Sequence, residues 1–266
     1  MRYKITIQYN GTNFAGWQKQ PRQFTVQGEL EKAIQSFSKK KTEVPGSGRT
    51  DAGVHALGQV AHFDLEKKYD EYKVLTAINF FLRKQWLERI IKIERNFRVK
   101  LESLKNSQAI ITKCEIVNSD FHARFSAKKR YYEYTIVNQR NTPLFEQNQV
   151  WHIKEKLDVQ KMQEAANCLI GKHDFSSFRD SDCQSTGPIK TVYEAKFTKQ
   201  KNKIIFKISA PSFLHHMVRN IMGTLKNVGT GKTSIKEFEK ILKAKDRTKA
   251  GANASACGLF LMKVDY

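Results

Sequence analysis

The sequence holds few cysteines, and their spacing excludes two ways of stabilising a small fold. The four cysteines are scattered and form no C-x-x-C pair, so neither a zinc knuckle nor a disulfide framework is expected. No stretch approaches the run of about eighteen apolar residues that a membrane-spanning helix requires. The N-terminal residues alternate between polar and apolar and lack the apolar core of a signal peptide. We therefore expect a protein of the reducing cytoplasm.

Acidic side chains are also scarce. Asp and Glu together number 26 against 47 Lys and Arg, which leaves a formal net charge of +21 on 266 residues. Such a surplus favours a polyanionic partner, nucleic acid above all, and a generically basic surface is the alternative. Hydrophobic residues still make up 40% of the chain, so a folded protein with a sizeable core is expected.

Signatures of several common enzyme classes are missing. No G-x-S-x-G of a serine hydrolase is present. The stretch GTGKTS at 229–234 imitates a phosphate-binding loop, but Lys226 replaces its first glycine and a helix is expected where that motif needs a strand. The stretch GSGRTD has Asp51 where a dinucleotide-binding loop has its third glycine. His215 and His216 are expected on a helix, where neighbours point apart and make a poor metal pair.

Hydrophobic periodicity predicts a mixture of strands and helices in both halves of the chain. Strands are expected at 2–9, 58–65, 108–117, 130–138, 189–197, 203–209 and 257–266, the strands at 189–197 and 203–209 forming a hairpin. Helices are expected at 26–37 with Thr25 as N-cap, and at 75–82, 159–169, 214–225 and 235–242. Residues 83–105 fit a helix better than a strand. This mixture predicts an α+β fold with antiparallel sheets and helices on one face.

The expected domain boundary lies near residue 105. It separates an N-terminal α+β half at 1–105 from a C-terminal α+β half at 106–266, because the order of strands and helices repeats in the second half. No low-complexity run or linker marks the boundary.

The stretch at 46–63 begins with a glycine-rich loop that carries Arg49 and Asp51 ahead of an expected strand. If the backbone at 49–51 is extended, the two charged side chains project to the same side. A nearby guanidinium keeps a carboxylate anionic, which suits a nucleophile better than a general acid. A surface ion pair at a turn is the alternative interpretation.

Segments spread along nearly the whole chain occur in the order found in one known family. They are YNGTNFAGWQKQ (9–20), TVQGELEKAI (25–34), GRTDAGVHALGQVAHF (48–63), FHARFSAKKRYYEYTIVN (121–138), GKHDFSSFR (171–179), FLHHMVRNIMGTL (213–225) and AKDRTKAGANASACGLFLMKVDY (244–266). Together they resemble the tRNA pseudouridine synthase A (TruA) family.

The resemblance implies roles for individual residues. Asp51 matches the catalytic aspartate, which forms a covalent adduct with the target uridine, and Arg219 matches its arginine partner. Arg49 matches the arginine that helps to evict the base from its stack, and Tyr132 matches the tyrosine that stacks on that base. The alternation of residues along the strand of Tyr132 is consistent with an aromatic platform, but by itself it favours a tyrosine of the core. Arg124, in the 121–138 segment, is counted among the substrate-binding residues.

The resemblance also implies a fold and an activity. The fold has two similar α+β halves, whose largely antiparallel sheets join across a basic central cleft with helices on the outer face. The activity is isomerisation of uridine to pseudouridine at positions 38–40 of the tRNA anticodon stem-loop by a homodimer, with no cofactor and no metal. The alternative is a catalytically silent tRNA-binding, RNA-binding or RNA-folding protein on the same scaffold.

The chain departs from the family pattern at a few positions. It has Asn10 where the family usually has Asp, Ala252 and Ser255 where prolines are usual, and Arg83 in place of the proline of an LP pair. The connection that follows also looks longer than usual. None of these departures involves the candidate catalytic residues.

The basic segment 83–105 coincides with this longer connection. On a helix, Arg95 and Arg98 would lie on one side, while Trp86 and Ile90 would face the core. The segment is then either a solvated helical face or an additional contact with RNA phosphates.

Overall fold

The computed structural model describes residues 1–97, 107–181, 183, 185 and 187–266. The chain forms two compact units, one of Met1–Ala127 together with Tyr266 and one of Lys128–Asp265. The boundary expected near residue 105 lies outside the described residues. Strand β3 (Ala109–Val117), which follows it, pairs with β1 (Arg2–Tyr9) and belongs to the first unit.

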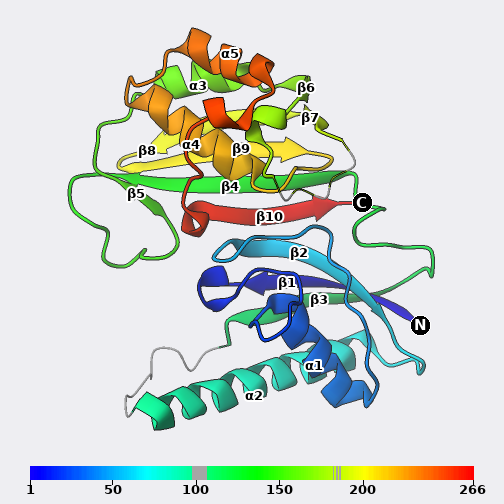
Figure 1. The fold of residues 1–266 in the computed structure, drawn as a ribbon. Coiled ribbons are helices and arrows are strands. Elements are labelled where there is room, and N and C mark those ends of the chain that lie inside the picture. Colours follow the sequence, from blue (N-terminus) through cyan, green and yellow to red (C-terminus); the bar gives the residue numbers. More distant parts are fainter. Residues whose placement is uncertain (98–106, 182, 184, 186) are drawn as a thin grey trace. The chain divides into compact units, whose positions relative to one another are not determined.

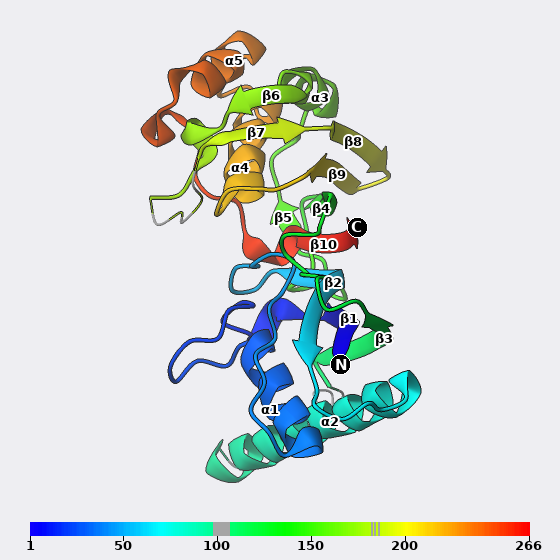
Figure 2. The same cartoon turned by 90° about the vertical axis from the view of Figure 1, so that its right-hand side faces the viewer.

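The first unit has an antiparallel sheet with β1 between β2 (His55–Asp64) and β3. Ile5 of β1 lies opposite Ala61 of β2 and Cys114 of β3. Alternate residues of β1 are buried, as the sequence predicts: Tyr3, Ile5, Ile7 and Tyr9. Helices α1 (Val26–Ser38) and α2 (Glu71–Phe97) lie on one side of this sheet (Figures 1 and 2). A short 3-10 helix, η1 (Gly11–Asn13), follows β1.

Local signals account for both helices of this unit. The Thr25 side chain accepts a hydrogen bond from the Gly28 N–H and caps α1, as predicted. The expected helix at 75–82 and the described part of the basic segment are one continuous helix, because no glycine or proline interrupts Glu71–Phe97. Trp86 and Ile90 are buried on it, as expected. The remainder of the segment, 98–105, lies outside the described residues.

The second unit has an antiparallel sheet in the order β10–β4–β9–β8. Its strands are β10 (Leu259–Asp265), β4 (Lys129–Asn138), β9 (Lys203–Ala210) and β8 (Glu194–Gln200). The short strand β5 (Trp151–Ile153) is parallel to β4. Strands β6 (Gly171–Asp174) and β7 (Ile189–Val192) form a separate antiparallel pair. The predicted hairpin of 203–209 with the preceding strand is confirmed by the β8–β9 pairing.

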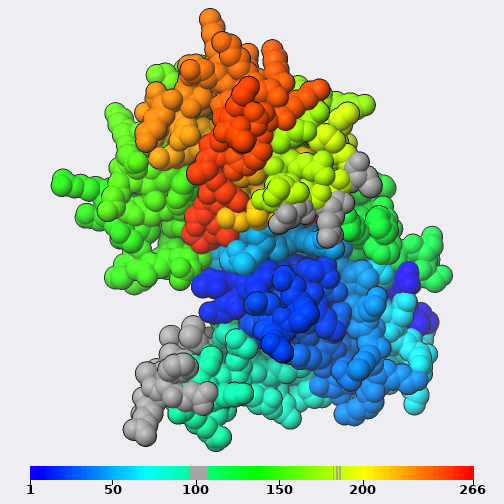
Figure 3. All heavy atoms as spheres, in the orientation of Figure 1, coloured from blue at the N-terminus to red at the C-terminus, as the bar shows by residue number. Residues whose placement is uncertain are grey.

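Helices α3 (Val159–Asn167), α4 (Met217–Gly229) and α5 (Ile235–Ala244) lie on one side of that sheet (Figures 1 and 2). Helix α5 begins at a capping box between Ser234 and Glu237, and it lies at the surface of its unit, in orange in Figure 3. The GTGKTS stretch follows helix α4 rather than a strand, so it is no phosphate-binding loop. The described part of the unit also contains the short 3-10 helices η3 (Ser176–Phe178), η4 (Arg247–Lys249) and η5 (Ala256–Gly258).

Two local expectations were wrong. Residues 189–197 are two strands in different sheets, because the chain leaves the β6–β7 pair at Tyr193 before it joins β9. Ala195 and Phe197 are buried as expected, but Ile189 and Tyr193 are more than half exposed, at 54% and 51%.

The second wrong expectation was that His215 and His216 lie on a helix. They precede α4 instead of lying within it, and their rings stack with centroids 3.9 Å apart. The cause is the left-handed backbone of His216, at φ 59°, which folds the second imidazole against the first.

The predicted fold class, α+β with antiparallel sheets and helices on one face of each, is confirmed. All four cysteines are free thiols. Within the described residues, none of the helices combines the length and apolar character needed to cross a membrane.

Candidate active site

The loop at 46–54 of the first unit is held on both sides by its neighbours. Ser47 N–H donates to the Val60 carbonyl at 2.7 Å, and the Ser47 hydroxyl donates to the buried Gln59 side chain at 2.6 Å. The Thr50 carbonyl accepts from Trp17 N–H at 3.0 Å, and the Thr50 hydroxyl shares a hydrogen bond with the Tyr9 hydroxyl at 2.8 Å. The loop is therefore a rigid platform fixed to β1, β2 and the segment between β1 and α1.

One glycine makes the close approach to this loop possible. Gly16 has φ +91°, and a Cβ atom there would lie 2.6 Å from the Thr50 carbonyl oxygen. Any other residue would push the loop away and would also strain its own backbone. The GW step at 16–17 is thus part of the structure that positions the loop.

Arg49 and Asp51 flank the buried Thr50 on this loop. Thr50 is buried while Arg49 and Asp51 on either side of it are more exposed, which fits an alternation of side chains along this loop. Arg49 is exposed, and its Nε donates to the Gln18 side chain at 3.0 Å. Asp51 is half-buried, and its carbonyl accepts from Val54 N–H at 3.1 Å. The backbone that carries the Asp51 carboxylate is therefore held in place.

Tyr132 lies on β4 in the second unit. It is 8% exposed, and its ring meets Phe213 edge-on with the centroids 5.1 Å apart. Along β4 it shares the buried side with Tyr134 and alternates with the more exposed Tyr131, whose hydroxyl donates to Asp265 at 2.6 Å. Tyr132 therefore combines the burial of a core residue with an aromatic partner beside it.

Arg219 lies in the first turns of α4. Its Nε donates to the Ala254 carbonyl at 2.9 Å, and Ala254 N–H donates back to the Arg219 carbonyl at 3.1 Å. This reciprocal pair fixes the direction of the guanidinium group. Burial raises the pKa of Tyr134 well above its usual value, and the charge of Arg219 acts in the opposite direction.

The predicted site residues thus divide between the units. Arg49 and Asp51 share one loop of the first unit, and Arg124 lies in the same unit on a separate turn after β3. Tyr132 and Arg219 belong to the second unit, on β4 and α4.

Sequence reasoning missed a polar cluster at the start of α4. The His216 Nδ1 atom lies 2.6 Å from a carboxylate oxygen of Asp180, and His215 Nδ1 lies 4.0 Å from the other oxygen. A carboxylate hydrogen-bonded to one imidazole ring nitrogen fixes the orientation of that ring. The adjacent histidines are the feature of the sequence that could have indicated this cluster, but they were interpreted only as possible metal ligands.

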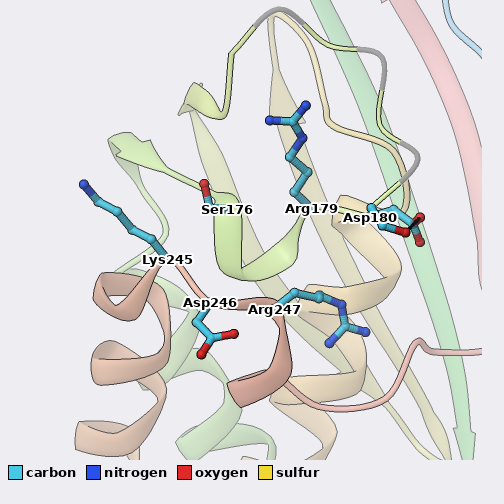
Figure 4. Close-up of a pocket in the computed structure, with 7 residues that line it drawn as sticks. Ser176, Arg179, Asp180, Lys245, Asp246 and Arg247 are labelled. Carbon is cyan, nitrogen blue, oxygen red and sulfur yellow. Dashed lines mark hydrogen bonds between the residues drawn. The ribbon is translucent and has the colours of Figure 1, made fainter.

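Sequence reasoning also missed a polar hollow of about 600 Å³ in the second unit, between η3 and the turn after α5 (Figure 4). Its basic lining residues are Arg179, Lys245 and Arg247. Arg179 donates to the Cys183 carbonyl at 2.8 Å, and Arg247 donates to the Asn220 side chain at 2.9 Å. Arg179 thus fixes the loop after η3, and Arg247 joins the turn after α5 to helix α4.

The sequence was compared with known protein families and with individual proteins. The profile of the tRNA pseudouridine synthase family matches residues 5–102 and 165–266. The chain is 46% identical to the tRNA pseudouridine synthase A of Wolbachia pipientis wMel over 267 aligned positions, covering 100% of both proteins. It is 45% identical, again over 100% of both, to the protein of that name from Wolbachia sp. subsp. Drosophila simulans (strain wRi).

Among solved structures, a chain of a Cbf5–Nop10–Gar1 complex is similar over 97% of this chain and 57% of that one, at 10% identity and a TM-score of 0.33. A similarity this weak adds nothing to the assignment. The family profile and the sequence relatives carry the assignment, because the relatives match from end to end at close to half identity. The resemblance seen in the motifs is confirmed, and the chain belongs to the tRNA pseudouridine synthase family.

Proposed function

We propose that this protein isomerises uridine to pseudouridine at positions 38–40 of the tRNA anticodon stem-loop. Membership of the family makes the chain an isomerase that acts on tRNA. The choice of positions follows from the motif resemblance along the whole chain. The observation that carries the proposal is the rigid loop that presents Asp51 beside Arg49.

Asp51 is the nucleophile of the proposed reaction and forms a covalent adduct with the target uridine. The glycosidic bond between N1 and C1′ breaks, the uracil turns, and a bond between C5 and C1′ forms. The bond to Asp51 then breaks, which releases the product and returns the carboxylate. C5 loses a proton and N1 gains one, so the atoms and electrons of substrate and product are the same. The net reaction therefore requires no oxidant, reductant or nucleotide.

The other candidate residues support this step. Arg219, directed by the Ala254 carbonyl, is the charge partner of the Asp51 carboxylate and keeps it ionised. Tyr132 stacks on the target base, and Arg49 takes the place that the base leaves in the helix stack. Arg124 holds the substrate backbone. Affinity comes mainly from phosphate contacts, which the charge of +21 supports.

The proposed assembly is a cytoplasmic homodimer that binds tRNA. The abundance of basic residues fits a polyanionic partner, and the free thiols suit a reducing compartment. The dimer rests on the family resemblance.

The test compares the wild-type protein with Asp51→Asn on an unmodified tRNA transcript. The amide keeps the size of the carboxylate but is a much poorer nucleophile. Single-turnover assays with saturating enzyme, read by mapping pseudouridine along the tRNA, should show product at one or more of positions 38–40 for the wild type. Asp51→Asn should form none, with tRNA binding within about twofold of wild type.

Asp64→Asn is the matched control, since it removes a carboxylate of the same unit that instead pairs with Arg2 at 2.7 Å. This variant should keep full activity. Wild-type protein that binds tRNA without forming product would identify a silent RNA-binding protein and refute the proposed activity. Product formed by Asp51→Asn would remove Asp51 from the nucleophile role.

A further inference from the structure

Phe125 is presented to solvent by a turn of the first unit. The turn at 121–126 follows β3, and its Phe125 side chain is 77% exposed. An exposed apolar side chain needs no explanation by itself. This one differs because it stands on a rigid backbone among aromatic rings and cations.

Every backbone N–H from His122 to Ser126 has a hydrogen-bond acceptor. Those of Arg124 and Phe125 donate to the His122 Nδ1 atom at 3.1 and 3.3 Å. The His122 N–H donates to the Ser126 hydroxyl oxygen, and the Ser126 N–H donates to the His122 carbonyl, both at 2.9 Å. Ala123 N–H donates to the buried His62 at 3.2 Å. The turn is therefore ordered before any ligand arrives.

His122 holds this turn as a neutral ring. Burial, then the charges of Arg2 and Arg124, lower the pKa of His122, so its Nδ1 stays an acceptor at neutral pH. The same ring supports Phe125, with ring centroids 4.4 Å apart and an angle of 34° between the planes. His62 backs His122 in turn at 4.7 Å. Phe125 thus tops a column of three rings that begins in the core.

One cation lies beside Phe125 and another beside two neighbouring rings. The Arg124 guanidinium lies 5.7 Å from the centre of the Phe125 ring. The Lys4 ammonium lies 5.8 Å from the Phe121 ring and 5.4 Å from the Tyr266 ring. Aromatic faces interleaved with positive charge are how proteins bind unpaired bases together with their phosphates.

We propose that Phe125 is a stacking platform for an unpaired nucleobase of the bound tRNA, with Arg124 beside the adjoining phosphate. The inference rests on the proposed function in taking tRNA as the ligand, and it adds a contact outside the candidate catalytic residues. A nucleobase with its phosphate fits this surface, because Arg124 and Lys4 place positive charge beside aromatic rings.

The test measures tRNA binding to Phe125→Ala, Phe125→Leu and Phe125→Trp in full-length protein across a salt series. Loss of one stacked base should weaken binding roughly 5- to 150-fold in Phe125→Ala. Phe125→Leu should lose much of that affinity although it keeps an apolar side chain, and Phe125→Trp should bind at least as well as wild type. Phe80→Ala is the matched control, since Phe80 is also exposed, at 62%, on α2 of the same unit.

Salt dependence separates the two parts of the platform. Phe125→Ala should leave the slope of log affinity against log salt unchanged, whereas Arg124→Gln should flatten it by roughly 0.7 to 0.9, the effect of removing one cation from a phosphate. Thermal unfolding midpoints equal to that of the wild type would show that the variants are folded. If Phe125→Ala does not fold, Phe125→Leu and Phe125→Trp still allow the comparison.

The outcomes are distinguishable from those for the catalytic proposal, because binding and pseudouridine formation are measured separately. Wild-type activity with Phe125→Ala binding like Phe80→Ala would overturn the platform and leave the activity intact. Weakened binding by Phe125→Ala without any product from the wild type would support the platform and refute the activity. A change in oligomeric state in Phe125→Ala, measured by light scattering, would make this surface a contact between copies and would also overturn the platform.

Discussion

Tyr131 and Tyr132 are neighbours on β4 whose side chains have different surroundings. Tyr131 is tied through its hydroxyl to Asp265, while Tyr132 lies against Phe213 at 8% exposure. Only one of two adjacent strand residues can meet a base, because they point to opposite faces. We expect Tyr132→Ala to slow single-turnover isomerisation far more than Tyr131→Ala, and Tyr132→Phe to stay near the wild-type rate because it keeps the ring.

Unfolding midpoints of these variants separate a catalytic effect from a packing defect, since removing a buried aromatic ring costs about 3 to 5 kcal/mol of stability. Equal rates for the two alanine variants would show that Tyr132 does not meet the base.

His62 carries a pH-dependent part of the stability. Burial, then the charges of His122 and Arg2, lower its pKa from the usual 6.5 to about 4. Because the folded pKa is depressed, the unfolded chain takes up the proton first as the pH falls from 6.5 towards 4. The free energy of unfolding should therefore fall in that window by about 1.4 kcal/mol per pH unit, or roughly 3 kcal/mol in all.

The measurement is denaturant unfolding of wild type and His62→Gln between about pH 4 and pH 7, the range that spans the folded and unfolded pKa of His62. The glutamine can still accept the Ala123 N–H but does not titrate, so the two curves should converge as the pH falls. His173→Gln, a histidine of the second unit beside Phe175, is the control and should run parallel to wild type. Curves for wild type and His62→Gln that stay parallel would rule out this role.

At the scale of elements, α2 joins a buried apolar side to an exposed basic one. Trp86 and Ile90 are buried, whereas Lys92 and Arg95 are exposed one turn apart. Arg89 lies over the Phe24 ring at 4.0 Å and fixes the helix to the segment before α1. The element is thus well enough anchored to present its charges to a ligand.

We expect Lys92→Gln with Arg95→Gln to flatten the salt dependence of tRNA binding by roughly 0.7 to 0.9 for each phosphate that no longer meets a cation. The control pair is Lys236→Gln with Lys240→Gln, on α5 at a similar helical spacing. Slope and affinity both unchanged in the α2 variant would make its basic side a solvated face.

At the scale of the whole molecule, the two units share one plan although they differ in their number of elements. Each has an antiparallel sheet with helices on one side, and each carries part of the candidate site. Arg49 and Asp51 stand on a loop that its own unit holds rigid, and Arg219 stands on a helix that the Ala254 segment orients. Each half of the chemistry is therefore prepared by contacts within one unit.

The sequence by itself determined what depends on neighbours a few residues apart. The alternation along β1, the Thr25 cap of α1 and the apolar side of α2 were predictable because burial, capping and helix continuity are local. The family could also be identified from the sequence, because the motifs of the family are contiguous stretches that occur in a fixed order. The same motifs indicated the candidate residues Asp51, Tyr132 and Arg219.

Only the tertiary structure decided what depends on contacts between distant segments. The break at Tyr193 follows from two different partner strands, and the stacked His215–His216 pair follows from a left-handed backbone. The clamp on the 46–54 loop needs Gly16, and the Phe125 turn needs the ring of His62 about sixty residues earlier. Hydrophobic periodicity indicates which side of an element is buried, but it does not indicate which distant segment buries that side. Contacts with such distant segments determine the strand break, the loop and the turn described above.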